Sequence, residues 1–313
     1  MSYLSRAVEL AERGRRTTYP NPVVGAVVVK DGEVVGEGWH ERKGGPHAEV
    51  VALDAAGERA RGAVLYVSME PCAHHGSTPP CTDAILRSGV GRVVAASRDP
   101  NPEAAGGLEL LRSRGAEVEE VDCFEARAQN EAWRTWVSLG RPFVTYKAAV
   151  TVEGGVTVPG SRWVSSPDSR RRVHELRAAS DAVAVGMGTA RTDDPRLDAR
   201  DVSVTRQPRR LAFGRGPLPP ASELELRAGP IRDELEALAA EGVQSLLLEG
   251  GPTLATAFVA EDLVDKLLLF VAPKLGGAGP RFLGELAAPV DLRRFHAERV
   301  GEDVLLSGYV HEP

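Results

Sequence analysis

The sequence predicts an α/β protein built from two domains. Short apolar runs typical of buried strands alternate with segments of helical periodicity. The length of 313 residues is about twice that of a usual single domain. Gly140-Arg141-Pro142 separates one series of strands and helices from a second series. We therefore expect one domain at residues 1–142 and another at residues 143–313.

The first domain is expected to be a layered sheet with helices packed on it. Strands are predicted at residues 23–29, 63–68, 92–96 and 117–121, and helices at residues 4–13, 48–56, 82–88, 108–114 and 124–139. Pro46 suits the first position of a helix, and Thr82 and Asp83 suit the first turn after Cys81. His47 and Cys81 are thus expected at two helix N-termini.

The second domain begins with a predicted strand at residues 143–151. Residues 182–189 and 245–253 each read as a buried strand that runs into glycines and then a helix. Glycines let a ligand approach the backbone, and the helix N-terminus after Gly251 offers free N–H groups to a pyrophosphate. Neither stretch is the G-x-G-x-x-G fingerprint, and a plain strand-to-helix turn explains each equally well. These residues alone leave nucleotide binding open.

The first domain also carries a pattern that predicts a catalytic metal: His47-Ala48-Glu49, Pro71-Cys72 and Pro79-Pro80-Cys81. One imidazole and two thiolates leave the fourth position of a tetrahedral zinc open for water, and the thiolates favour zinc among the metals. Such a zinc makes hydroxide near neutral pH. Glu49 can carry a proton from that water to a ring nitrogen and then to a leaving amine. This H-x-E with P-C-x-x-C signature is typical of zinc deaminases acting on bases.

Eight residues separate Cys72 from Cys81, where that signature has two. A loop therefore lies beside the predicted metal and can line a substrate pocket. The alternatives are that the cysteines are ordinary buried residues, or that His74 or His40 completes a structural zinc site. Cys123 has no partner motif and is expected in the core.

Composition limits the partners and the compartment. A net charge of −6 argues against a nucleic-acid groove. The densest basic run, Arg170-Arg171-Arg172, is interpreted as a solvated helix face in preference to a phosphate site. No segment approaches the length of a membrane span. Three cysteines, two of them needed as thiolates, fit a reducing compartment. We expect a cytoplasmic enzyme that acts on small molecules and binds neither nucleic acid nor membrane.

The first half resembles the deaminase domain of the bifunctional deaminase/reductase family of riboflavin biosynthesis. The matching segments are residues 20–25, 36–40, 47–49, 70–81 and 99–102. The resemblance implies a cytidine-deaminase-like three-layer domain and, as substrate, a diamino-pyrimidinone carrying a phosphoribosylamino group. It implies that the substrate is contacted by Asn21, His40, His74, Asp99 and Asn101. Ser77 departs from the family, which usually has Lys or Arg there, suited to a substrate phosphate.

The second half resembles the reductase domain of the same family, which implies a dihydrofolate-reductase-like α/β fold that uses NADPH. By this resemblance the phosphorylated substrate is held by Lys147, Ser161, Arg177, Leu197, Arg200 and Glu249. The cofactor is held by Ala149, Trp163, Thr189, Asp193, Gly251, Pro252, Thr253, Leu254, Ala255, Thr256 and Ala257. A guanidinium fork binds phosphate in a bidentate way, which suits the two arginines. Without the resemblance they would be interpreted as surface residues, and Asp193 as a cap or turn residue.

Three departures from the family affect the second half. Val152-Glu153-Gly154-Gly155 replaces an Asp-Gly-Lys or Asp-Gly-Arg segment, and Leu211-Ala212-Phe213-Gly214 replaces a strand that ends in Asp. Residues 218–231 are short by about one strand and one helix. A lost strand would leave an exposed sheet edge unless another chain covers it, so a homo-oligomer is expected.

The predicted function is a two-step enzyme of riboflavin synthesis. The first domain would remove a pyrimidine amine as ammonia, and the second would reduce the ribosyl group to ribityl with NADPH. One alternative is a deaminase whose second domain is a degenerate dimerisation module. The other is a nucleic-acid-editing deaminase, which should show a basic, aromatic-bearing surface and the shorter cysteine spacing.

Overall fold

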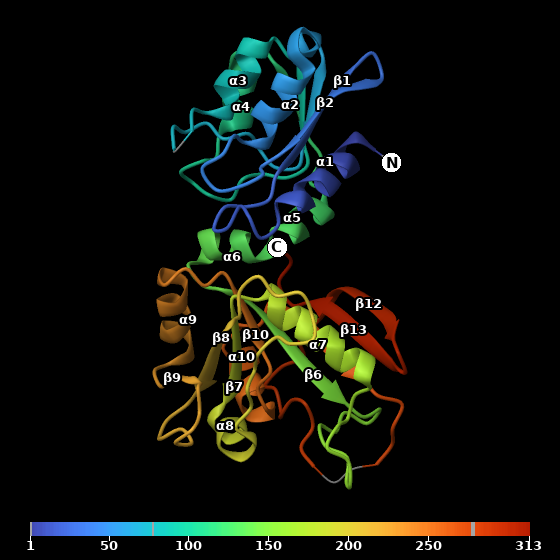
Figure 1. Ribbon diagram of the computed structural model, residues 1–313, viewed down its shortest axis with the longest axis vertical. Helices are drawn as coiled ribbons and strands as arrows, with labels where there is room; N and C mark the ends of the chain where they lie inside the picture. The colour runs from blue at the N-terminus through green and yellow to red at the C-terminus, as the bar shows by residue number, and fades with distance from the viewer. Residues whose placement is uncertain (1, 77, 277–278) are drawn as a thin grey trace. The chain divides into compact units, whose positions relative to one another are not determined.

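The computed structural model describes residues 2–76, 78–276 and 279–313. Ser77, the predicted departure near the substrate phosphate, lies outside the described residues. The chain divides into two compact units, Met1–Leu139 with Pro313, and Gly140–Glu312. Figure 1 follows the chain through both units.

The first unit contains, among its described residues, a five-stranded sheet in the order β2-β1-β3-β4-β5. The strands β1 and β2 form an antiparallel hairpin, β3 runs antiparallel to β1, and β3, β4 and β5 are parallel. Their bounds are Gly25–Lys30 (β1), Glu33–Trp39 (β2), Val64–Val67 (β3), Arg92–Ala95 (β4) and Glu117–Glu120 (β5).

Helices cover both faces of this sheet because successive strand residues point to opposite sides. On one face, Ala26 and Val28 share a buried cluster with side chains of α2 (Ala48–Ala56), α3 (Cys81–Ser88) and α4 (Gly107–Ser113). On the other face, Val27 and Val29 pack on Ala7 and Leu10 of α1 (Tyr3–Ala11). Short 3₁₀ turns follow α1 at Glu12–Gly14 and α2 at Gly57–Ala60. This is the predicted three-layer arrangement.

The prediction of one helix over residues 124–139 is wrong, because the chain breaks at Asn130. Two helices lie there, α5 (Phe124–Gln129) and α6 (Glu131–Leu139). The buried Asn130 side chain accepts a hydrogen bond from the Val23 amide and donates one to the Val23 carbonyl, both at 2.9 Å. A polar contact between two residues that are 107 positions apart in sequence thus interrupts a helical pattern. Pro46 is also displaced from its predicted place: it precedes His47, the N-cap of α2.

The second unit contains, among the residues described, an eight-stranded sheet in the order β12-β13-β11-β6-β10-β7-β8-β9. Strands from β11 to β9 are parallel, and β13 and β12 add an antiparallel hairpin at one edge. The bounds are Phe143–Val150 (β6), Ala182–Gly186 (β7), Arg209–Phe213 (β8), Glu225–Arg227 (β9), Ser245–Leu248 (β10), Lys266–Val271 (β11), Arg293–Val300 (β12) and Asp303–Tyr309 (β13).

Helices again cover both faces of the sheet (Figure 1). The main core packs one face against α9 (Ile231–Ala240) and α10 (Pro252–Ala260), with Leu235, Leu238 and Phe258 fully buried. The opposite face packs on α7 (Pro167–Ala179) and α8 (Met187–Asp193) through Leu176, Met187 and other side chains. Parallel strands buried on both faces are why β7 and β10 are continuous apolar runs.

The structure shows where the segments that depart from the family pattern lie. The Glu153 carboxylate accepts a hydrogen bond from the Gly276 amide at 2.6 Å, so it joins two loops of the second unit. Strand β8 ends at Phe213, and Gly214 follows with φ 133°, a conformation that favours glycine. At that edge the sheet ends on the three-residue strand β9.

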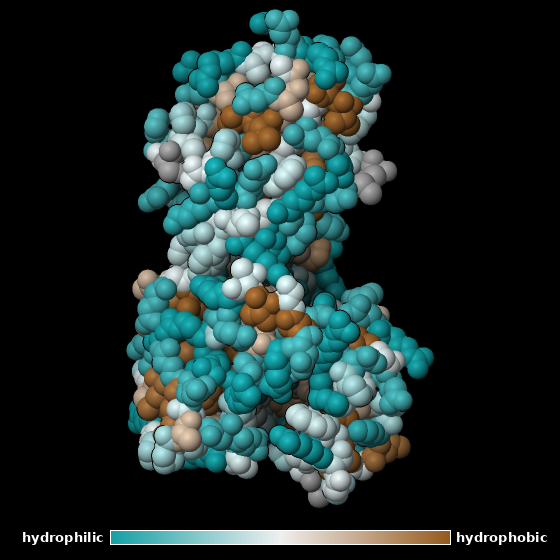
Figure 2. Space-filling view, in the orientation of Figure 1, coloured by the Kyte–Doolittle hydropathy of each residue, from teal (hydrophilic) through white to brown (hydrophobic). Residues whose placement is uncertain are grey.

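The face of the molecule in Figure 2 is mostly hydrophilic, with hydrophobic residues in separate patches. None of the helices in the described part of the chain combines the length and apolar character that a membrane crossing requires.

Candidate active sites

The residues His47, Cys72 and Cys81 come together in the first unit. His47 is the N-cap of α2, Cys81 is the first residue of α3, and Cys72 lies beyond the end of β3. Their ligand atoms lie within 4.8 Å of one another. His47 Nδ1 is 3.1 Å from Cys81 Sγ and 3.6 Å from Cys72 Sγ. Ordinary zinc bond lengths at a tetrahedral angle place such N and S atoms roughly 3.5 Å apart, so these side chains fit a zinc ion.

The surroundings orient these three side chains. His47 Nε2 lies 3.3 Å from Thr78 Oγ1, which leaves Nδ1 facing the sulfur atoms. The Cys81 amide donates to Cys72 Sγ at 3.3 Å. A hydrogen bond from the Cys81 thiol lowers the pKa of Cys72 to about 4, while the same pairing raises the pKa of Cys81. The pair therefore presents at least one thiolate, the form that binds zinc.

Glu49 lies in the first turn of α2, two residues after His47, and is 3% exposed. Burial raises the pKa of this carboxyl to about 7. A group whose pKa is near neutral can both accept and release a proton, as a proton carrier in a deaminase must.

Two predicted pyrimidine contacts lie next to the metal cluster. The rings of His40 and His47 are 5.3 Å apart, and the Asn21 side-chain amide is 3.4 Å from His40 Nε2. His40 Nδ1 contacts the Pro46 carbonyl at 3.0 Å. Because burial lowers its pKa, His40 is neutral near pH 7. The structure thus presents Asn21 and a neutral imidazole as hydrogen-bonding groups.

Asp99 and Asn101 lie on a loop that Glu70 holds. The Glu70 carboxylate is buried and accepts hydrogen bonds from the amides of Asp99, Gly106 and Leu108, each at 3.1 Å. Asp99 itself accepts from the Asn101 amide at 2.8 Å, and burial raises its pKa to about 6. No sequence pattern predicts this role for Glu70, because its partners are backbone amides 29 to 38 residues away.

His74, the remaining predicted contact, is exposed on the loop between Cys72 and Cys81. Cys123 is not in the core as predicted but half-buried at the N-cap of α5. It has no part in the metal cluster.

A pocket of about 730 Å³ lies in the second unit, where β6, β7 and β10 end. Ligands of open α/β sheets bind outside the carboxyl ends of the strands, in pockets of about 300–1,000 Å³. Ten of the predicted reductase residues line it: Lys147, Ala149, Trp163, Arg177, Thr189, Asp193, Arg200, Glu249, Gly251 and Pro252.

At the pocket, Glu249 is held by two cations. Its carboxylate lies 2.9 Å from Lys147 Nζ and accepts from Arg177 at 2.6 and 3.0 Å. Burial alone would raise the pKa of Glu249, but the two cations outweigh it and lower that pKa to about 2. Glu249 is therefore an anion at all working pH values.

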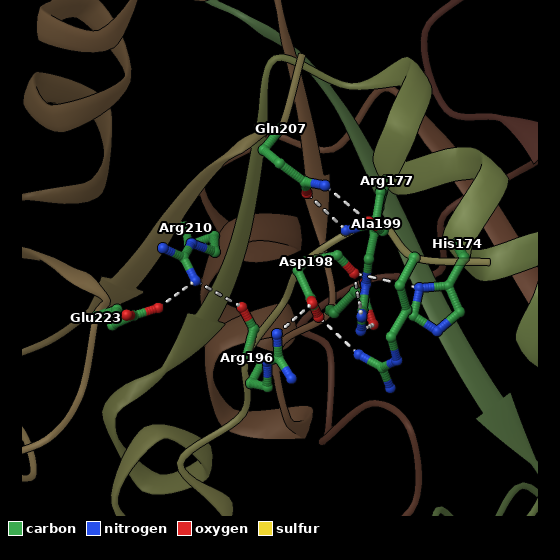
Figure 3. Close-up of polar contacts among 10 residues, drawn as sticks. His174, Arg177, Arg196, Asp198, Ala199, Gln207, Arg210 and Glu223 are labelled. Atoms are coloured by element: carbon green, nitrogen blue, oxygen red, sulfur yellow. Dashed lines mark hydrogen bonds and ion pairs between the residues drawn. The ribbon is translucent and has the colours of Figure 1, made fainter. Parts of the chain in front are cut away.

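A second polar cluster fixes the loop that carries Arg200 (Figure 3). The Asp198 carbonyl accepts from His174 Nδ1 at 3.2 Å and from Arg177 at 3.1 Å. The Asp198 carboxylate pairs with Arg200 at 2.6 Å and with Arg196 at 3.1 Å. The Gln207 side chain bonds the Ala199 backbone at 2.8 and 2.9 Å, which ties the loop down further.

Several predicted reductase residues do not line the pocket. Ser161 bonds the Trp163 backbone at 2.8 Å and so shapes the neighbouring loop. Leu197 is 2% exposed and packs in the core, and Ala255 is fully buried. Thr253, Leu254, Thr256 and Ala257 follow on α10, away from the lining. Conversely, Arg162, Arg170, Arg171 and His174 line the pocket although the sequence interpretation did not place them there.

The start of α10 is suited to a dinucleotide. The helix begins after the N-cap Gly251, whose position makes no side-chain cap, and Pro252 has no N–H. The first N–H groups that can bind a phosphate are therefore those of Thr253 and Leu254. A Cβ at Gly188 would meet nothing within 4 Å, and one at Gly251 would meet only Thr189 Oγ1, at 3.5 Å. The backbone there is open to a ligand, so the residues present fit NADPH.

Comparison with known proteins finds a family model that matches each half of the chain. A model described as the RibD C-terminal domain matches residues 142–306, and one described as the cytidine and deoxycytidylate deaminase zinc-binding region matches residues 1–97. The chain is 41% identical to riboflavin biosynthesis protein RibD of Aquifex aeolicus (strain VF5), over 97% of each chain. The chain belongs to the RibD family.

Other relatives are similar to this chain over nearly its whole length. Identity to RibD of Escherichia coli (strain K12) is 36%, over 97% of each chain. The structure of Acinetobacter baumannii RibD superposes with a TM-score of 0.84 at 33% identity, covering 98% of this chain and 97% of that one. A Thermotoga maritima structure, a diaminohydroxyphosphoribosylaminopyrimidine deaminase/5-amino-6-(5-phosphoribosylamino)uracil reductase, gives 0.83 at 34% identity with the same coverage.

Family membership confirms the predicted fold class and the bifunctional enzyme of riboflavin biosynthesis. Its cofactors are zinc in the deaminase domain and NADPH in the reductase domain. The alternatives of a nucleic-acid-editing deaminase and of a degenerate second domain are thereby set aside.

Proposed function

We propose that this chain deaminates a diamino-pyrimidinone bearing a phosphoribosylamino group and then reduces the ribosyl group of the product to ribityl. The observation that carries the proposal is the cluster of His47, Cys72 and Cys81 beside the buried carboxyl of Glu49. The cationic pocket around Glu249 supports the second step. The Thermotoga maritima relative, named for the same two reactions, supports the choice of substrates.

In the deaminase step His47, Cys72 and Cys81 would hold zinc. The metal supplies hydroxide from water near neutral pH. Glu49 takes the proton released from that water on its carboxylate and passes it to the pyrimidine ring nitrogen. It then carries a second proton, from the hydroxyl added to the ring carbon, to the departing amine. Water and the C–NH₂ group become C=O and ammonia. Asn21, His40, His74, Asp99 and Asn101 would bind and orient the pyrimidine.

In the reductase step Lys147, Arg177, Arg200 and Glu249 would bind the phosphorylated substrate in the pocket, with Ser161 and Leu197 shaping the loops around it. Ala149, Trp163, Thr189 and Asp193 would bind the cofactor, together with residues 251–257 at the start of α10. NADPH supplies the hydride. The protein contributes orientation: Arg177 is fixed by Glu249 and by the Asp198 carbonyl before any ligand binds.

We assign the deaminase domain to residues 1–142 and the reductase domain to residues 143–313, and we propose that the enzyme is a cytoplasmic homo-oligomer. Its two sulfur ligands require a reducing compartment. Self-association is supported by the outer strand β12, which is exposed along nearly its whole length and carries Phe295 at 57% exposure. Sedimentation of the purified protein tests the oligomer.

The function is tested by following ammonia release and NADPH oxidation separately on the purified chain. Glu49→Gln should abolish ammonia release, and Arg200→Ala should abolish NADPH oxidation. Matched controls are Asp54→Asn, exposed on the same helix as Glu49, and Arg196→Ala, which pairs with the same Asp198 as Arg200 but does not line the pocket. Absence of ammonia release from the unaltered protein would disprove the assigned substrate. Ammonia release without NADPH oxidation would disprove the second step.

A further inference from the structure

One face of α7 lines the reductase pocket through Pro167, Arg170, Arg171, His174 and Arg177. Counted from Pro167, these residues occupy positions i, i+3, i+4, i+7 and i+10, which lie on one side of a helix. Arg172 is not among the lining residues, and it pairs with Glu175 at 3.0 Å. The basic run is therefore only partly a solvated face: two of its three arginines border the pocket.

The cations of the pocket differ in how far they are neutralised. Lys147 and Arg177 pair with Glu249, and Arg200 pairs with Asp198. Among the residues that the structure describes, Arg170 donates a hydrogen bond to the Ser165 carbonyl, at 2.8 Å. Within the described residues, no carboxylate lies at ion-pair distance from Arg170 or Arg162. Arg162 and Arg170 are thus the described lining arginines without a carboxylate partner, although the group of Lys147, Arg177 and Glu249 also keeps one net positive charge.

Both arginines lie against the same aromatic ring. The guanidinium carbons of Arg162 and Arg170 are each 5.0 Å from the centre of the Trp163 ring. Lys274 Nζ donates to the carbonyls of Trp163 at 3.3 Å and Val164 at 2.8 Å, which holds this segment beside the pocket. The ring attracts each cation weakly, but the two like charges repel one another. A phosphate dianion bound by both guanidinium groups would offset that repulsion.

We propose that Arg162 and Arg170 form a phosphate site beside Trp163, which binds the phosphate monoester of a reductase ligand. The proposal rests on the proposed function, which offers two such groups: the phosphate of the phosphoribosyl substrate and the 2′-phosphate of NADPH. A guanidinium fork suits a phosphate, and the N-terminus of α7, capped by Ser166, adds its positive end nearby. Arg177 and Arg200, already paired with carboxylates, then serve mainly to orient the sugar.

Four ligands titrated against the full chain and against the double variant Arg162→Gln/Arg170→Gln test the site. The probes are NADPH with NADH, and ribose 5-phosphate with ribose, so each pair differs by one phosphate. Loss of charged hydrogen bonds should weaken one phosphorylated ligand by about 10- to 100-fold and leave its partner without phosphate unchanged. If the double variant binds NADPH more weakly, the site belongs to the cofactor. If it binds ribose 5-phosphate more weakly, the site belongs to the substrate.

Arg172→Gln is the matched control, since it removes a charge from the same run outside the pocket, and it should bind all four ligands like the unaltered chain. A second double variant, Arg162→Gln/Arg170→Lys, keeps one positive charge without the guanidinium fork. It should bind the phosphorylated ligand more tightly than Arg162→Gln/Arg170→Gln does. Unchanged binding in the double variant, or an equal loss for both members of a pair, would overturn the proposal. An unaltered chain that binds neither NADPH nor ribose 5-phosphate would reject the proposed reductase function together with this site.

Discussion

Arg177 and Glu249, which are 72 residues apart in sequence, form a bidentate ion pair with N–O distances of 2.6 and 3.0 Å. Arg177 comes from α7 and Glu249 from the end of β10, so the pair joins a helix to the sheet at the pocket. Both side chains are largely buried, with 13% and 7% of their surface exposed. Such a pair fixes the positions of both side chains, but it also makes the stability of the fold depend on the charge of one carboxylate.

The ion pair should weaken in acid. The pKa of Glu249 is lowered from 4.5 to about 2. The contribution of the ion pair to the free energy of unfolding is therefore fully present above pH 4.5 and is lost as pH falls toward 2. The full contribution is about 3 kcal/mol, from roughly 1.4 kcal/mol per pKa unit. Thermal unfolding of the unaltered chain and of Glu249→Gln should show a gap in stability at neutral pH that narrows in acid. A gap that stays constant with pH would show that this carboxylate does not titrate as described.

Removal of one sulfur ligand should remove the metal. We expect Cys81→Ser to lose bound zinc and ammonia release while it still oxidises NADPH with a substrate that is already deaminated. Cys123→Ser changes the remaining cysteine, which lies outside the cluster, and should keep both the bound zinc and ammonia release. Zinc is measured by metal analysis of the purified protein, and a chelator should reproduce the Cys81→Ser result. Full zinc content in Cys81→Ser would argue against the ligand set.

Glu70 should affect substrate binding through the loop that it holds. In Glu70→Gln one acceptor oxygen becomes an NH₂ group that faces backbone N–H groups, so the loop bearing Asp99 and Asn101 loosens. We expect KM for the deaminase substrate to rise by about tenfold, with a smaller fall in kcat and no loss of zinc. Glu103→Gln, an exposed change on the same loop, is the control. Loss of zinc in Glu70→Gln would mean that Glu70 supports the metal site itself.

Asn130 should matter for stability although it is far from the sites. Asn130→Ala leaves the buried amide and carbonyl of Val23 without partners, which should cost about 2–4 kcal/mol. Asn130→Asp keeps the acceptor for the Val23 amide but sets a buried carboxylate oxygen against the Val23 carbonyl oxygen, so it should cost at least as much as Asn130→Ala. Urea unfolding of the three proteins measures the order. Equal stability of Asn130→Ala and the unaltered chain would refute the role of this contact.

The pattern of apolar residues was sufficient to predict β1, β3, β4 and β5 of the first unit and β6, β7 and β10 of the second, because buried faces repeat with the period of the element. The strands β9, β11, β12 and β13 were not predicted from this pattern. It failed at Asn130, where a helical pattern on both sides hides a break imposed by Val23. It also missed the strand β2, whose glycines Gly36 and Gly38 weaken the strand pattern. A Cβ at either glycine would lie within 2.5 Å of a backbone carbonyl oxygen of α2, so close helix packing explains both.

By itself the sequence determined the metal-binding residue types, their order, and their places at strand ends and helix starts, because these depend on local spacing and local backbone preference. Only the tertiary structure decided that Glu70 binds amides 29 to 38 residues away and that Glu249 pairs with both Lys147 and Arg177. It also decided that Arg170 and Arg172 of one basic run have different environments. Hydrogen bonds and charge pairing depend on which atoms meet in space. That information enters only when distant segments pack together.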